Sequence, residues 1–370
     1  MKKIVISINT SWNVFNFRIG LIKALMEDGF QVIALAPKDE YSSKLQEFGC
    51  QFIPLPMDRN GTRPIQDLIL LLRYYLLLRK IKPDAYLGYT IKPNIYGSLA
   101  SRLLNIPVIN NIAGLGTTFI NNGPITSIVK RLYKLSLAKS KCIFFQNNDD
   151  LELFVKLNLV DRLKTDRVPG SGINLKRYPD AISTDKFPFN FLFIGRILKD
   201  KGVIEYVEAA KIVLKTFPNT KFSILGFIDT DNANSISLNQ IQQWENEGII
   251  QYLGETDDVR PFIADSSCVV LPSYREGVPR SLLEAAAMSR PIIATNVAGC
   301  KDVVENGVNG YLCEPKNSRN LSERMIEMIT LPKEKRAALG IAGRRKVENE
   351  FNETYVINKY LHALKTLRVK

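Results

Sequence analysis

The stretch SCVVLPSYREGVPRSLLE, residues 267–284, reads as a buried strand, a loop and the start of a helix. The apolar run 267–272 predicts the strand, and Pro279, a residue favoured at the first position of a helix, predicts that a helix follows. Glu276 is then a loop carboxylate at the carboxyl end of a strand, where open α/β sheets bind ligands. Glu284 lies in the helix, whose N-terminal N–H groups suit a phosphate. The stretch therefore predicts an α/β sheet with an anion site between two carboxylates.

Alternating strand and helix signals extend on both sides of this stretch and predict two parallel sheets. The first series of expected strands covers residues 3–9, 31–36, 51–55, 85–89, 108–112 and 141–146, and the second covers 190–194, 222–225, 250–253, 267–272, 291–294 and 310–313. Helices are expected at 17–28, 42–48, 65–80, 96–104, 127–138, 202–217, 259–264, 318–330, 333–350 and 352–367. The Pro-, Gly- and Ser-rich residues 168–174 separate the series, and 370 residues exceed one hydrophobic core. We expect an α/β protein with two doubly wound, Rossmann-like domains facing across a cleft.

The composition excludes several kinds of chemistry. His362 is the single histidine, and the five cysteines are scattered without a C-x-x-C pair. We therefore expect no metal site, no Ser-His-Asp triad, no histidine general base and no cofactor. No secretory signal precedes the first strand, and the apolar run Leu68–Leu78 is interrupted by Arg73 and too short to span a membrane. These features predict a cytoplasmic protein that uses carboxylates, cations, backbone groups or the substrate itself.

Positive charge is concentrated in the first half of the chain. The net charge is +13, and residues 1–180 contribute +11, from 25 Lys and Arg against 14 Asp and Glu. An anionic membrane surface and nucleic acid are the two explanations, and the scarcity of aromatic residues among the basic ones disfavours nucleic acid. The helix expected at 65–80 has an apolar face with a basic margin, which suits a membrane surface. A helix packed on the core, with solvated cations, is the alternative.

A cation-bearing loop follows the first strand of the second series. Gly195 and Arg196 are separated by four residues from Lys201 and Gly202. Arginine gives bidentate contacts to phosphate and lysine a mobile point charge, so this loop predicts a phosphate site. An ordinary solvated loop is the alternative.

Glu284 also has a structural alternative. Ser281 and Glu284 have the spacing of a capping box, in which the glutamate would satisfy backbone N–H groups at the start of the helix.

Polar and glycine-rich loops follow three strands of the first series. They contain Asn13 after the first strand, Thr90, Lys92 and Asn94 after the fourth, and Gly114 and Gly116 after the fifth. Glycines after a strand permit close backbone approach to a ligand. Their spacing is not that of a dinucleotide fingerprint, which excludes a nicotinamide cofactor. A turn imposed by Pro93 is the alternative for the second loop.

With these motifs the chain resembles the family-4 retaining glycosyltransferases of the GT-B fold. Glu276-x7-Glu284 is similar to the family's E-x7-E motif, and the loop at 195–202 is similar to its G-R-x4-K-G motif. The resemblance covers essentially the whole chain. It implies an acceptor- and membrane-facing domain at 1–170, a nucleotide-sugar domain at 171–350, and a final helix at 351–370 that returns to the first domain.

The resemblance implies a role for each site residue. Arg196 and Lys201 would bind the diphosphate of a UDP-sugar and stabilise charge on the leaving group. Glu276 would hold hydroxyls of the transferred sugar, and Glu284 those of the ribose. The remaining expected contacts to the sugar donor come from Gly195, Gly277, Val278 and Arg280, while the six loop residues of the first series would bind the acceptor. The family is metal-independent, and its leaving diphosphate assists attack on the same face of the sugar.

Residues 90–94 and 111–116 resemble a subgroup that builds lipid-linked bacterial glycans. We therefore expect transfer of an N-acetylhexosamine to an undecaprenyl-diphosphate-linked saccharide at the cytoplasmic face of the inner membrane. The first domain departs from many relatives, which have a Gly-Gly loop where this chain has Asn9–Asn13 and carry a histidine that is absent here. The alternatives are a transferase for another cell-surface polysaccharide, a sugar-nucleotide 2-epimerase or phosphorylase, and a non-catalytic basic protein that binds lipid or nucleic acid.

Overall fold

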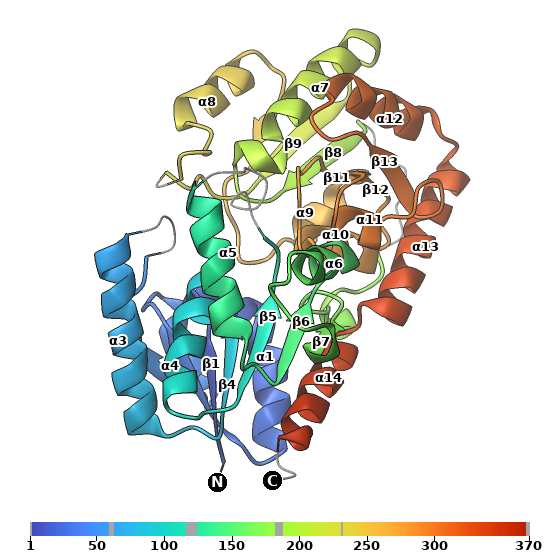
Figure 1. The fold of residues 1–370 in the computed structure, drawn as a ribbon. Coiled ribbons are helices and arrows are strands. Elements are labelled where there is room, and N and C mark those ends of the chain that lie inside the picture. The colour runs from blue at the N-terminus through green and yellow to red at the C-terminus, as the bar shows by residue number, and fades with distance from the viewer. Residues whose placement is uncertain (1, 59–62, 116–123, 182–187, 231, 368–370) are drawn as a thin grey trace. The chain divides into compact units, whose positions relative to one another are not determined.

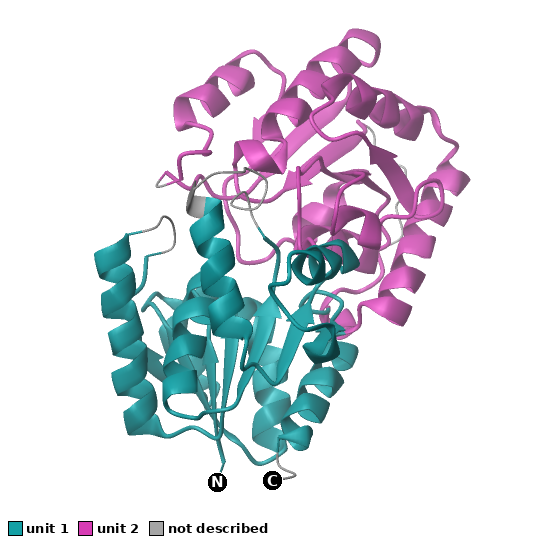
Figure 2. Cartoon of the chain, in the orientation of Figure 1, with its two compact units in different colours: residues 1–172, 353–370 teal, residues 173–352 magenta. Residues whose placement is uncertain are grey.

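The computed structural model describes residues 2–58, 63–115, 124–181, 188–230 and 232–367. The chain forms two compact units, residues 1–172 with 353–370 and residues 173–352 (Figure 2). Gly170 and Gly172 adopt the positive φ angles +64° and +68° at the crossover between them. A Cβ atom on Gly172 would lie 2.4 Å from the Glu353 Cα, so only glycine fits where the chain leaves and re-enters the first unit.

The first unit is a seven-stranded parallel sheet of order β3-β2-β1-β4-β5-β6-β7 (Figure 1). Its strands are β1 Lys3–Ser7, β2 Gln31–Ala36, β3 Gln51–Pro54, β4 Ala85–Tyr89, β5 Val108–Ile112, β6 Cys142–Phe145 and β7 Thr165–Arg167. Its α-helices are α1 Ser11–Glu27, α2 Tyr41–Glu47, α3 Pro64–Ile81, α4 Ser98–Leu103, α5 Pro124–Leu137, α6 Asn148–Lys156 and α14 Glu353–Thr366. Side chains alternate across the sheet: one face packs on α1, α2 and α14, and the other on α3, α4, α5 and α6.

The second unit is a six-stranded parallel sheet of order β10-β9-β8-β11-β12-β13. Its strands are β8 Asn190–Ile194, β9 Lys221–Leu225, β10 Gln251–Tyr252, β11 Cys268–Leu271, β12 Ile292–Thr295 and β13 Gly310–Cys313. Its α-helices are α7 Val203–Thr216, α8 Leu238–Asn246, α9 Arg260–Asp265, α10 Arg280–Ala287, α11 Cys300–Val303, α12 Ser318–Thr330 and α13 Lys333–Glu350. A single hydrophobic core fills this unit.

The predicted strands are present in the predicted order, but several predicted helix starts were wrong; α5, for example, begins at Pro124 rather than at residue 127. The first helix begins at Ser11 rather than at residue 17, because the Thr10 side chain caps it by accepting from the Asn13 N–H at 3.0 Å. A π-helical turn at Pro93–Gly97 precedes α4, so Pro93 opens a helical segment instead of a simple turn. Pro279 is the N-cap of α10, one residue before the position we predicted. The short strand β7 and helices α6, α8 and α11 were not predicted.

Helix α14 completes the first unit. Tyr360 is fully buried, its ring lies 4.8 Å from the ring of Phe144, and its hydroxyl accepts from Asn111 at 2.9 Å. Lys359 pairs with Asp166 at 2.7 Å. No helix of the described residues is long and apolar enough to cross a bilayer.

Candidate functional site

Three loops of the second unit meet at the carboxyl ends of β8, β11 and β12. The Tyr274 N–H donates to the Asp200 carbonyl at 2.9 Å, and the Glu276 N–H donates to the Ala298 carbonyl at 3.1 Å. The loops also approach too closely for side chains at two glycines. A Cβ on Gly202 would lie 2.1 Å from the Pro272 carbonyl oxygen. At Gly299 it would lie 2.4 Å from the Gly277 carbonyl oxygen, and both glycines have φ near +80°.

A close charged pair in this loop cluster joins Lys201 to Glu276. The Lys201 Nζ lies 2.5 Å from the Glu276 Oε1, and the Ser273 hydroxyl donates to the same oxygen at 2.8 Å. The two charged side chains are only 18% and 12% exposed, which strengthens their attraction relative to a pair in open water. The sequence predicted both charged residues but not Ser273, whose short polar side chain gives no distinctive signal.

Arg196 extends from the same loop as Lys201 but has another partner. Its guanidinium lies 3.6 Å from the Asp229 carboxylate and is 45% exposed, so the ion pair is a weak one. Gly195 directly follows β8, and its N–H donates to the Leu225 carbonyl at 3.1 Å. Arg196 therefore shares a loop with Lys201 but does not share its partner. Because its guanidinium is partly exposed and its ion pair is weak, it remains available to an anionic ligand.

Glu284 takes part in a second buried cluster. Its Oε1 accepts from the Tyr178 hydroxyl at 2.7 Å and from the Arg280 Nε at 3.1 Å. Burial and the charge of Glu284 together raise the pKa of Tyr178 to about 12. The capping-box alternative is wrong, because α10 has no side-chain cap and the Glu284 oxygen turns to Tyr178 and Arg280 instead of back towards Ser281.

The loop between these two clusters is folded into the unit. Gly277 is buried, and Val278 packs against the hydrophobic core. Of the predicted sugar-donor residues, Lys201 and Glu276 thus form one cluster, Arg280 and Glu284 form the other, and Gly277 and Val278 lie on the segment that joins them.

The predicted acceptor residues of the first unit differ in their surroundings. Asn13 lies in the first turn of α1 and donates to the Asn9 side chain at 3.0 Å. Thr90 adopts a φ of +60°, and its hydroxyl donates to the Tyr89 carbonyl at 2.6 Å. Lys92 pairs with Asp67 at 2.9 Å, and both side chains are largely buried. Gly114 has a φ of +121°, and Gly116 lies outside the described residues.

Asn94 belongs to the interior of the first unit. It is fully buried; its amide donates to the Asn111 carbonyl at 2.8 Å and its oxygen accepts from Asn110 at 2.8 Å. Because these bonds satisfy a buried amide, we remove Asn94 from the predicted acceptor contacts.

Arg18 is a further residue that the sequence reasoning missed. It is 5% exposed, its guanidinium lies 4.4 Å from the centre of the Tyr89 ring, and its hydrogen bond goes to the Phe17 carbonyl at 3.2 Å. Its Nε has no partner among the described residues. A buried cation is costly without an anion, and the ring compensates only in part. The available signal was its place in the buried stripe of α1, with Val14 and Leu21.

Two family models match the chain. The model described as Glycosyl transferase 4-like matches residues 3–147, and the model described as Glycosyl transferases group 1 matches residues 177–346. The first lies in the first unit, and the second contains both clusters of the loop site. The chain therefore belongs to the group 1 glycosyltransferases, the family that its motifs resemble.

Named relatives agree with this assignment, and a solved structure has the same fold. The chain is similar to the Campylobacter jejuni N,N'-diacetylbacillosaminyl-diphospho-undecaprenol alpha-1,3-N-acetylgalactosaminyltransferase, at 29% identity over 94% of each chain. It is also similar to the Escherichia coli UDP-Gal:alpha-D-GlcNAc-diphosphoundecaprenol alpha-1,3-galactosyltransferase, at 29% identity over 68% of this chain and 67% of the relative. A glycosyltransferase structure from Rickettsia africae matches with a TM-score of 0.79 at 20% identity, covering 100% of this chain and 99% of that one. The predicted GT-B fold is confirmed.

Proposed function

We propose that the protein transfers an N-acetylhexosamine from a UDP-sugar to an undecaprenyl-diphosphate-linked saccharide, with retention of the anomeric configuration. The observation that carries the proposal is the pairing of Lys201 with Glu276 on loops that glycines bring together at the carboxyl ends of parallel strands. The names of two relatives, which act on undecaprenyl-diphosphate-linked acceptors, support the choice of acceptor.

Each cluster of the second unit has a part in this proposal. Lys201 and Arg196 bind the diphosphate and offset the charge that develops on it as the glycosidic bond breaks. Glu276, held by Ser273, accepts hydrogen bonds from hydroxyls of the transferred sugar. Glu284 accepts from ribose hydroxyls, with its carboxylate oriented by Tyr178 and Arg280. The backbone around Gly195, Gly277 and Val278 lines the path of the phosphates.

The first unit supplies the acceptor side of the proposal. Arg18 is the residue we assign to the diphosphate of the lipid-linked acceptor, because it is a buried guanidinium that lacks a carboxylate partner among the described residues. Asn13, Thr90, Lys92, Gly114 and Gly116 stay as proposed acceptor contacts. As the resemblance to the family implies, we propose a metal-independent reaction at the cytoplasmic face of the inner membrane.

The test is a screen of sugar donors by UDP release. Purified protein is incubated with UDP-GlcNAc, UDP-GalNAc, UDP-glucose or UDP-galactose, with and without an undecaprenyl-diphosphate-linked sugar in detergent. We expect acceptor-dependent UDP release with one of the two N-acetylhexosamine donors, insensitive to EDTA. Release only with a hexose donor would contradict the proposed sugar, and release only with a different glycan acceptor would favour another polysaccharide pathway. The absence of release with every pair would favour a non-catalytic binding protein.

A further inference from the structure

The outward face of α3 is apolar. Ile65, Leu68, Ile69, Leu72 and Leu76 are between 42% and 78% exposed. At about 100° per residue these five positions fall within an arc of roughly 100° on one side of the helix. The opposite side, with Leu70, Tyr74 and Leu78, packs on the sheet. The helix thus packs on the core, as the alternative for it expects, and in addition leaves a second apolar side exposed.

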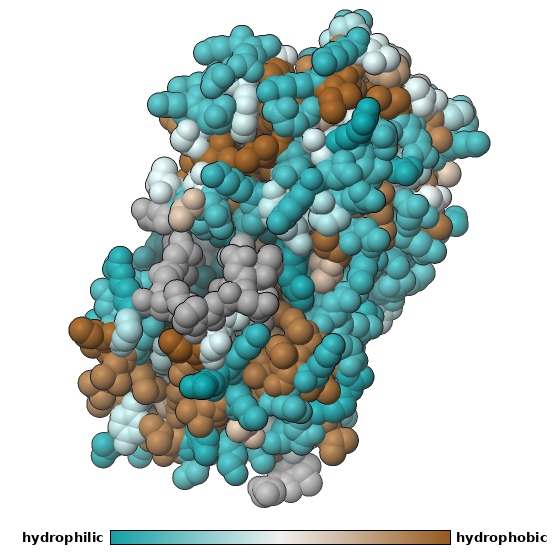
Figure 3. All heavy atoms as spheres, turned by 45° about the horizontal axis from the view of Figure 1, so that its top comes forward, coloured by the Kyte–Doolittle hydropathy of each residue, from teal (hydrophilic) through white to brown (hydrophobic). Residues whose placement is uncertain are grey.

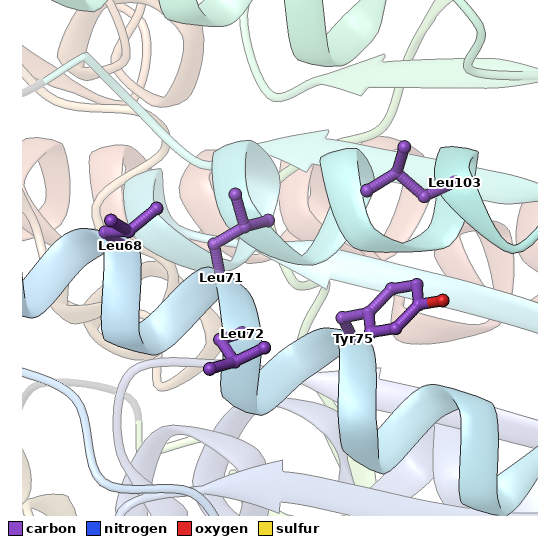
Figure 4. A pocket seen from close by; sticks show the side chains of 5 residues that line it. All are labelled: Leu68, Leu71, Leu72, Tyr75 and Leu103. Atoms are coloured by element: carbon purple, nitrogen blue, oxygen red, sulfur yellow. The ribbon is translucent and has the colours of Figure 1, made fainter.

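A hollow lies between α3 and α4 and extends this apolar surface. It has a volume of about 400 Å³ and is lined by Leu68, Leu71, Leu72, Tyr75 and Leu103 (Figure 4). Leu103, on α4, is itself 68% exposed. In Figure 3 the hydrophobic side chains gather at the lower left, over α3 and α4. On the neighbouring helix α5, Ile128 and Leu135 are 55% and 51% exposed. We call the outer surface of these helices the α3–α5 face.

The charges on the α3–α5 face are of one sign. The three helices carry seven basic residues, Arg73, Arg79, Lys80, Arg102, Lys130, Arg131 and Lys134, against one acidic residue. That acid, Asp67, is buried and paired with Lys92 at 2.9 Å. Apolar residues flanked by cations, without exposed acids, match the acyl chains and headgroups of an anionic bilayer. A second copy of the face would meet it with like charge, which disfavours self-association.

We propose that the α3–α5 face docks on an anionic lipid bilayer, with the α3 leucines among the acyl chains and the basic residues at the headgroups. This inference rests on the proposed function only in placing the face near a lipid-linked acceptor. Docking would hold the first unit at the bilayer surface, where the diphosphate of such an acceptor lies.

The test is co-flotation of the full chain with vesicles. The vesicles are phosphatidylcholine alone or a 3:1 mixture of phosphatidylcholine and phosphatidylglycerol, and the proteins are the wild type and Leu68→Gln/Leu72→Gln/Leu76→Gln. A matched control, Leu163→Gln/Leu238→Gln/Val308→Gln, removes three exposed apolar residues outside the face. A second pair compares Arg73→Gln/Arg79→Gln/Lys80→Gln with Lys221→Gln/Lys333→Gln/Lys335→Gln, whose residues are also exposed.

We expect the wild type and both controls to float with the anionic vesicles, and each α3 variant to bind them at least about tenfold more weakly. Equal binding by the α3 variants, or wild-type binding that ignores phosphatidylglycerol, would overturn the proposal. So would self-association in sedimentation velocity that the leucine variant abolishes, since the face would then join two copies. UDP release with a detergent-solubilised acceptor should be unchanged in both α3 variants. If UDP release is absent in the wild type and in all variants while the wild type still floats with anionic vesicles, the proposed function is refuted and the proposed membrane docking is not.

Discussion

At the scale of single residues, the proposed function depends on the pairing of Lys201 with Glu276 in the second unit. The two groups offset each other's charge while both are mostly buried, and Ser273 fixes the carboxylate. The arrangement presents a cation and an oriented carboxylate a few ångströms apart, as recognition of a phosphate next to a sugar hydroxyl requires.

Replacing Lys201 by Ala is expected to lower kcat for sugar transfer by about 100-fold or more, because one charge stabilising the leaving diphosphate is lost. Glu276→Ala is expected to have a loss of similar size. Both variants should keep the wild-type circular dichroism spectrum, since they alter loop side chains. Lys199→Ala is the matched control, because Lys199 is an exposed cation two residues away in the same loop. Near wild-type turnover in either site variant would remove that residue from the site.

Arg18 allows an independent test of the acceptor side. We expect Arg18→Met to raise KM for a lipid-diphosphate acceptor by roughly tenfold or more, the loss typical of a charge-assisted hydrogen bond, and to leave the KM for the UDP-sugar unchanged. Lys23→Met, at an exposed position of the same helix, should have the wild-type KM for both. A variant that is less stable but has an unchanged acceptor KM would show that Arg18 is purely structural.

Tyr178 gives a pH-dependent prediction. Its folded-state pKa of about 12 lies above the value of about 10 for an unfolded chain, so the folded state holds the phenol proton more tightly. Its contribution to stability is complete below pH 10 and is lost as the pH rises towards 12. The free energy of unfolding in urea should therefore fall less between pH 9 and pH 11 for Tyr178→Phe than for the wild type. An equal fall in both proteins would contradict the raised pKa.

At the scale of elements, the sequence predicted the bounds of buried strands better than the starts of helices. Buried parallel strands are mostly apolar, so β2, β4, β8 and β13 have the predicted bounds. The predicted start of α1 is wrong because the mostly polar residues Asn9–Asn13 are typical of a loop, whereas the Thr10 side chain caps a helix there. Helix α8 was missed because only Ile241 and Trp244 of its side chains are buried, too few to give a clear period.

The loop between β8 and α7 passes close to the end of β11 at Gly202, and a substitution there tests the energetic importance of this approach. Gly202→Ala is expected to lower the free energy of unfolding by about 2–4 kcal/mol, because it adds a clash with the Pro272 carbonyl to the cost of a positive φ. Gly248→Ala is the matched control, with a φ of +70° and no atom within 4 Å of the new Cβ, and should cost about 1 kcal/mol. Equal losses in urea denaturation would show that the close approach to Pro272 has no energetic consequence.

At the scale of the whole molecule, the last helix closes the first unit although it follows the second in sequence. Val356, Tyr360, Ala363 and Leu364 are buried in that unit's core. Deleting residues 353–370 should therefore expose the first unit to limited proteolysis while the second stays protected. Tyr360→Phe, which removes only the hydroxyl bonded to Asn111, should be cleaved much more slowly. Equal protection of both units in the deletion variant would contradict this dependence.

The sequence by itself determined the α/β class, two sheets, the family and the charged residues of the sugar-donor motifs, because strand periodicity and the spacing of Glu276 and Glu284 are local properties of the chain. Only the tertiary structure decided which partners those residues have. Glu284 turns to Tyr178, 106 positions away, and Asn94 is enclosed by neighbouring strands. It also decided which side of α3 is exposed, since a helix that is apolar on both sides carries no signal for which side meets the sheet. Such contacts join residues far apart in sequence, where no local pattern records them.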